Sequence, residues 1–114
     1  MNTVQANRSA FAETFGETPL VKVIDFFLTY PDFDYSKSQV ANETGISRIT
    51  IEGIWNKLIK RGIISKTRNL GRAELYRLNR ESPLVKILMK TAFDLSAHFL
   101  EEESGLQKKL SSLA

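Results

Sequence analysis

Residues 36–61 read SKSQVANETGISRITIEGIWNKLIKR, and this segment has the spacing of two short helices joined by a tight turn. Ser36 and Gln39 form the pattern of a capping box, which starts a helix. Gly45 stands where the end of that helix needs a residue that accepts positive φ. Ser47 is then placed to cap a second helix. The segment therefore predicts two helices that cross closely on either side of Gly45.

Apolar residues recur through the same segment at helical spacing. Ala41 provides the small side chain that a close helix crossing requires, and Ile51 and Ile54 face it from the second helix. The other members of this expected core are Val40, Ile46 and Leu58. This arrangement resembles the helix-turn-helix signature of DNA-binding proteins.

The residues before this pair predict one clear helix. Thr18 can cap it and Pro19 is favoured at its first position, while Pro31 cannot continue it. An extended connector then leads to Ser36. Residues 1–17 are mostly small and polar, and we expect a loose arm or a short helix there.

The residues after the pair predict a hairpin and a long helix. Gly62 ends the second helix, a strand covers residues 63–67, residues 68–72 form a basic turn, and residues 73–78 return as a second strand. Ser82 and Pro83 start the last helix, which we expect to run to Glu103. We expect Gly105 to break it, with a short amphipathic tail beyond.

The order of these elements resembles a winged helix-turn-helix regulator, similar to the small MarR/ArsR-like regulators of bacteria and archaea. The runs SRITIEGIWNKLIKRGII and RNLGRAELYRLN carry the resemblance, which covers residues 18–100. It implies an α+β, mostly α fold with a two-stranded β-hairpin wing and a long C-terminal helix. It divides the chain into an N-terminal arm (1–17), a DNA-binding domain (18–81) and a C-terminal dimerisation helix with its tail (82–114).

The composition of the 114 residues leaves few chemistries open. There is no cysteine and one histidine, His98, so neither thiol chemistry nor the Cys or His clusters of ArsR-type metal sensors are expected. No run approaches the roughly 18 apolar residues of a membrane span, and the N-terminus lacks the apolar core of a secretory signal. We expect a cytoplasmic, nucleoid-associated protein that is not an enzyme and needs no metal or cofactor.

Charge is concentrated in the middle of the chain. Residues 47–80 contain nine Lys or Arg against two Glu, a net charge of +7, although the whole chain carries only +3. Residues 1–46 and 81–103 each carry −3. Such a block attracts polyanions, and double-stranded DNA is the expected partner.

The second helix of the pair is the expected recognition helix, with its exposed face in the major groove. Ser47 and Thr50 lie at its N-terminus, where free amides favour a phosphate. Base contacts are predicted for Arg48, Ile49, Glu52 and Asn56, because these side chains match guanine, thymine, cytosine and adenine edges. Gly53 either allows close approach to DNA or is a tolerated glycine. Lys57 and Lys60, towards the far end of this helix, are predicted to contact phosphates or to remain surface charges. On the wing, DNA contacts in the minor groove or along the backbone are predicted for Lys66, Arg68 and Arg72.

Two other aromatic or titratable residues invite a functional interpretation that the sequence does not favour. Trp55 is placed between core positions, so we expect packing rather than base stacking. His98 lies four residues after Asp94 and can pair with it on the last helix.

Tyr76 and Leu78 alternate along the second hairpin strand and are expected to pack inward, with Arg77 pointing away.

Apolar residues cover more of the last helix than docking on its own domain requires. A homodimer is the expected solution. The expected interface residues are Leu84, Val85, Leu88, Met89, Ala92, Phe93, Ser96 and Phe99. The alternative is a monomer in which Phe11 and Phe15 fold back over this face.

Other functions remain open at this stage. A winged-helix module for protein interaction or assembly in a nucleic-acid-handling complex is the main alternative, because fold does not fix function. RNA binding is less favoured, since no sheet with exposed aromatics is predicted. The sequence does not identify an operator or a small-molecule effector.

Overall fold

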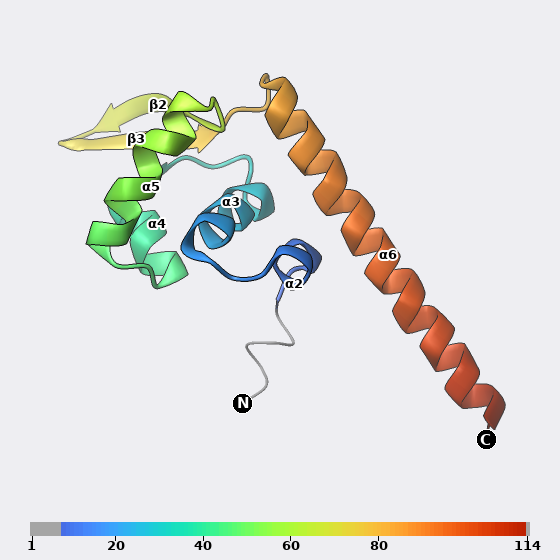
Figure 1. Cartoon of the computed structure of the whole chain (residues 1–114). Helices are drawn as coiled ribbons and strands as arrows, with labels where there is room; N and C mark the ends of the chain where they lie inside the picture. Colours follow the sequence, from blue (N-terminus) through green and yellow to red (C-terminus); the bar gives the residue numbers. More distant parts are fainter. Residues whose placement is uncertain (1–7, 114) are drawn as a thin grey trace.

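The computed structural model describes residues 8–113 (Figure 1). In chain order the elements are α2 (Ala10–Phe15), α3 (Pro19–Thr29), β1 (Tyr35–Ser36), α4 (Lys37–Thr44), α5 (Arg48–Lys60), β2 (Ile64–Leu70), β3 (Ala73–Leu78) and α6 (Pro83–Leu113). The helices α3, α4 and α5 form one body with the small sheet, and β2 and β3 form the hairpin that we call the wing.

The predicted caps set the helix boundaries. Thr18 and Ser47 each accept a hydrogen bond from a backbone amide three residues later, at 3.4 and 3.2 Å. Ser36 and Gln39 form the complete capping box, with each side chain accepting from the other's backbone amide at 3.1 and 2.8 Å. Gly45 ends α4 with φ at +73°, in the left-handed region that glycine enters without strain. The turn between α4 and α5 is therefore as predicted.

The expected core forms around the crossing of α4 and α5. Ala41 is 5% exposed, which lets the two helices approach closely. Val40, Ile51 and Leu58 are fully buried, and Ile54 packs against them from a half-buried position. Helix α3 completes this core with two further fully buried residues, Val23 and Phe27.

The sheet has three antiparallel strands in the order β1-β3-β2. The expected connector supplies β1, whose Tyr35 pairs with Tyr76 of β3. The first hairpin strand is longer than predicted, because its ladder with β3 continues to the pair Leu70–Ala73. Arg68 and Asn69 therefore belong to β2, and the turn contracts to Gly71 and Arg72. Tyr76 and Leu78 pack into the core as expected, and Arg77 between them is exposed, also as expected.

The last helix also differs from its predicted length. Helix α6 runs unbroken for 31 residues from Pro83 to Leu113, and Gly105 does not interrupt it. A single glycine in a helix interior costs only about 1 kcal/mol relative to alanine, so the flanking helix formers carry the helix through it. At 1.5 Å per residue the helix is about 46 Å long.

Residues 8–17 contain a short helix, which is one of the two expectations for the N-terminal arm. Helix α2 contacts both α3 and α6. Its N-cap, Ser9, donates a hydrogen bond to Asp25 of α3 at 2.7 Å, and burial raises the pKa of that carboxyl. Phe11 is buried, whereas Phe15 is 53% exposed, so only one of the two phenylalanines covers the apolar body. Residues 1–7 of the expected arm lie outside the described residues.

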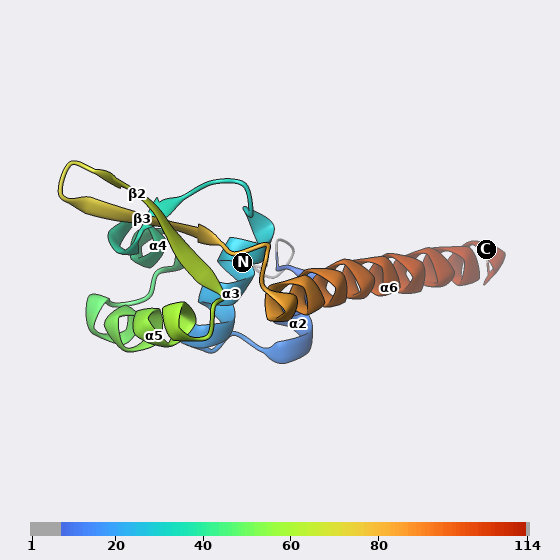
Figure 2. The ribbon, with the colours of Figure 1, turned by 90° about the horizontal axis from the view of Figure 1, so that it is seen from above.

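Two parts project from opposite ends of the body. The wing extends from one end and the distal part of α6 from the other, as both views show (Figure 1, Figure 2). The principal extents are 60 × 33 × 21 Å, and the radius of gyration is 16.7 Å. A compact chain of this length has a radius of about 13 Å. The difference reflects the part of α6 that leaves the body.

Candidate nucleic-acid interface

Helix α5 separates a buried face from an exposed one as the sequence predicted. Ile51, Trp55 and Leu58 are at most 2% exposed. The predicted base-contact residues and Gly53 are all exposed, and Ile49 reaches 87%. An isoleucine so exposed gains nothing from the chain's own core, which makes it available to an apolar group such as a thymine methyl.

The N-terminus of α5 is locally ordered by its own hydroxyls. Ser47 Oγ accepts from the Thr50 amide at 3.2 Å, and it also donates to Thr50 Oγ1 at 3.0 Å. Both residues are exposed. The capped first turn presents the positive end of the helix dipole to solvent, where a phosphate is favoured.

Glu52 has a partner that the sequence did not predict. Lys37, the first residue of α4, approaches its carboxylate with Nζ–Oε1 at 2.9 Å. The ammonium reduces the repulsion that Glu52 presents to a polyanion and restricts where the carboxylate points. Lys37 is fifteen residues away in sequence. Only the helix crossing brings the two together.

The cations of this surface fall into two groups. Lys66 pairs with Glu74 across the wing at 3.3 Å, and Arg68 pairs with Asp34 at 3.0 Å. Within residues 8–113, no ion pair is formed by the following predicted DNA contacts: Arg48, Lys57, Lys60 and Arg72. All four are exposed.

A groove of ≈ 490 Å³ lies between the start of α4, helix α5 and the wing. Asn56 of α5 and Arg72 of the wing turn line it from opposite elements. Two predicted DNA contacts that are far apart in the sequence thus share one concave surface. Lys37 and Ser38 line the same groove from α4.

Trp55 is a core residue, as the sequence favoured. Its ring lies edge-on to Tyr76, with centroids 5.4 Å apart and an interplanar angle of 86°, and 6.0 Å from the ring of Phe27. It therefore links α5 to β3 of the wing and to α3. Burial and the nearby Glu74 raise the pKa of Tyr76, whose hydroxyl donates to that carboxylate at 3.3 Å.

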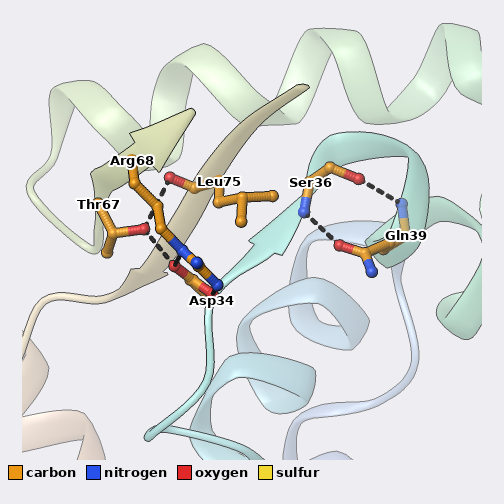
Figure 3. A network of polar contacts seen from close by, with 6 residues as sticks. All are labelled: Asp34, Ser36, Gln39, Thr67, Arg68 and Leu75. Atoms are coloured by element: carbon orange, nitrogen blue, oxygen red, sulfur yellow. Dashed lines mark hydrogen bonds and ion pairs between the residues drawn. The ribbon is translucent and has the colours of Figure 1, made fainter. Parts of the chain in front are cut away.

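Arg68 is engaged by the body of the protein. Asp34, in the connector before β1, accepts from Arg68 Nε and Nη2 at 3.0 and 3.3 Å and from Thr67 Oγ1 at 2.5 Å (Figure 3). These hydrogen bonds lower the pKa of the Asp34 carboxyl to about 2. No local pattern in the sequence links residues so far apart along the chain.

The expected dimer face of α6 requires one clear correction. Val85 is fully buried in the chain's own core, and Met89 packs against that core. Periodicity identifies apolar positions on the helix but not which of them dock on the chain's own body, and the body takes these two residues. Phe93 is 73% exposed at a groove that Phe11 of α2 also lines, and Leu84 is 40% exposed.

Polar pairs on α6 also differ from expectation. His98 lies 3.5 Å from Glu102, one turn later, while Asp94 pairs with Lys90 at 2.7 Å. Both pairs are exposed helix-surface contacts, which contribute only a few tenths of a kcal/mol. No group of three or more His, Cys, Asp or Glu within residues 8–113 is placed to hold a metal ion. None of the described helices has the length and apolar character to cross a membrane.

Comparison with solved structures finds proteins of the same fold. MepR of Staphylococcus aureus in complex with DNA is 16% identical with a TM-score of 0.56, over 90% of this chain and 86% of that one. A cysteine mutant of ZitR from Lactococcus lactis, in complex with DNA, is 18% identical with a TM-score of 0.51, over 81% of this chain and 70% of that one. The fold is a winged helix-turn-helix.

A third structure, NadR in complex with 4-hydroxyphenylacetate, is 20% identical with a TM-score of 0.60, over 94% of this chain and 81% of that one. No family model matches the chain, and none of the curated proteins matches it in sequence. The likeness therefore concerns the fold, and the predicted fold class is confirmed.

Proposed function

We propose that this protein binds double-stranded DNA sequence-specifically and regulates transcription, without enzymatic activity, at the nucleoid. The observation that carries the proposal is the surface formed by α5 and the wing. Within the described residues, Arg48, Lys57 and Lys60 of α5 and Arg72 of the wing turn are exposed and form no ion pair. Their like charges repel one another unless a polyanion neutralises them. The DNA complexes of MepR and ZitR support the same use of this fold.

In this proposal α5 enters the major groove. Arg48, Ile49, Glu52 and Asn56 contact base edges, and the first turn with Ser47 and Thr50 contacts a phosphate. Lys57 and Lys60 at the far end of α5 neutralise backbone charge. The wing reaches the backbone or the minor groove through Lys66 and Arg72.

We also propose that two copies pair along α6. The helix continues past the body with Leu106, Leu110 and Leu113, each more than half exposed and spaced by four and three residues. Phe93 and Leu100 are 73% and 64% exposed on the same helix. The other interface residues retained from the sequence are Leu84, Leu88, Ala92, Ser96 and Phe99. A two-fold pair sets two copies of α5 on successive turns of DNA, about 34 Å apart.

Selection of bound duplexes from a random pool, at a stated salt concentration, tests the function. We expect one enriched motif with two related halves about 10 base pairs apart. The alternative, a protein-assembly module, predicts no enriched motif and binding no stronger than that of a generic polycation of the same charge.

A further inference from the structure

The wing contains a bulge whose effect is to turn two successive side chains toward one carboxylate. Successive side chains of a regular strand point to opposite faces. The register of β2 against β3 shifts between Lys66 and Arg68, and this irregularity leaves Thr67 and Arg68 both facing Asp34 (Figure 3). We call the contacts of Asp34 with these two residues the wing clamp.

The wing clamp joins all three strands of the sheet. Asp34 directly precedes β1, which pairs with one edge of β3, whereas Thr67 and Arg68 belong to β2 on the other edge. The Thr67 hydroxyl also lies 3.2 Å from the carbonyl oxygen of Leu75 in the middle strand. The carboxylate therefore crosses β3 and links the connector to β2.

Little else attaches this part of the wing to the body. After Ile64, every residue of β2 is exposed, so β2 has no apolar anchor beyond its first residue. Within residues 8–113, Asp34 is the side-chain partner that residues 65–70 have outside the hairpin. Arg72 lies in the turn just beyond, so its position follows the direction of the wing.

We propose that Asp34 is a positioning residue that sets the direction of the wing for DNA binding by holding Arg68 and Thr67. The inference rests on the proposed function and replaces a direct DNA contact of Arg68 with an indirect one. Arg68 donates hydrogen bonds from Nε and Nη2 to the carboxylate, and the Asp34 side chain is only 16% exposed. Arg72 then contacts the DNA, and the wing clamp sets the position from which it does so.

The direction in which Asp34→Ala changes DNA affinity distinguishes this role from a simple charge effect. An acidic residue near bound DNA normally weakens binding, so its removal raises affinity. If the wing clamp positions the wing, Asp34→Ala instead lowers affinity for the selected duplex, by about tenfold, within the range of coupling between residues in contact. Asp32→Ala is the matched control, because Asp32 lies in the same connector, carries the same charge, pairs with Arg80 and has no part in the wing clamp.

A double-mutant cycle provides the second test. We expect Arg68→Ala to lower affinity as Asp34→Ala does, and the double variant to lose no more than either single one. Hydroxyl-radical footprints of the two single variants and the double variant should lose the protection of the DNA flank that the wing contacts. They should keep the protection at the centre of each half-site. If Arg68 is a plain phosphate contact, Asp34→Ala tightens binding, and Arg68→Ala alone reduces the salt slope by about 1.

Amide hydrogen exchange of the DNA-free protein tests the positioning directly. Asp34→Ala should speed amide exchange in residues 65–72 and leave exchange in α5 unchanged. If the variant and the wild type exchange at the same rate in the wing, the inference is overturned. Thr67→Val, at an exposed strand position, repeats both tests with a smaller loss if Asp34→Ala does not fold. Wild-type protein that binds no duplex contradicts the proposed function and this role together. Wild-type binding with undiminished binding by Asp34→Ala contradicts the wing clamp alone.

Discussion

Arg48 and Lys60 are the first and last residues of α5, and together they distinguish base recognition from phosphate binding. Arg48→Ala should cost about 1–3 kcal/mol on the preferred site and relax the preference at one base position, because a bidentate contact to guanine is lost. Lys60→Ala should weaken all duplexes alike. Binding to a panel of single-base variants of the selected site measures both. A preference altered by Lys60→Ala but not by Arg48→Ala would reverse our assignment of the two ends.

Gly53 offers a test in which stability and binding move in opposite directions. A Cβ at this position would meet no atom of the chain within 4 Å, and the residue is exposed within α5. Gly53→Ala should therefore raise the free energy of unfolding by about 1 kcal/mol. If DNA approaches the helix closely here, the same variant binds the selected duplex more weakly. Thermal unfolding and a binding isotherm together decide the question, and unchanged affinity would show that Gly53 is merely tolerated.

At the scale of elements, the continuity of α6 through Gly105 can be tested by substitution. Gly105→Pro should remove a helical hydrogen bond, cost about 3 kcal/mol locally and reduce the helical circular dichroism signal. Gly105→Ala is the control and should preserve or increase that signal, because its Cβ meets no other atom within 4 Å. A chain whose helix already ended at Gly105 would tolerate the proline without loss of helicity.

Elements with local signals are predictable from sequence. The capping box of Ser36 and Gln39, the positive φ of Gly45 and the caps at Thr18 and Ser47 depend on residues at most a few positions apart. The buried face of α5 follows from its periodicity in the same way. Local signals alone therefore predict the helix-turn-helix and the exposed face of the candidate site.

Features that depend on distant partners are not predictable in this way. The strand β2 continues to Leu70 because a ladder partner exists, although Arg68 and Asn69 favour a turn locally. The pairs Lys37–Glu52 and Asp34–Arg68 join residues 15 and 34 positions apart. The prediction for Val85 is wrong, because periodicity identifies stripes on a helix but does not say which stripe the body covers.

For the whole molecule, the projecting part of α6 predicts a dimer. Light scattering at micromolar concentration should give twice the chain mass of 12.9 kDa. A Phe93→Glu, Leu110→Glu double variant should shift the protein to monomer without unfolding it, because both side chains are more than half exposed. Met89 is unsuitable for this purpose, since it packs against the core. A mass near 12.9 kDa for the wild type would contradict the dimer, and an unchanged dimer in the double variant would contradict this interface.

The salt dependence of duplex binding tests the central claim most directly, because the basic surface of α5 and the wing must release counterions from DNA. Binding isotherms on the selected duplex, taken between about 50 and 200 mM salt, give the slope. For a dimer that contacts roughly 6–10 phosphates, we predict a fall in affinity of about 10³–10⁵ across that range. An affinity that stays flat over the same range would contradict DNA binding by this surface.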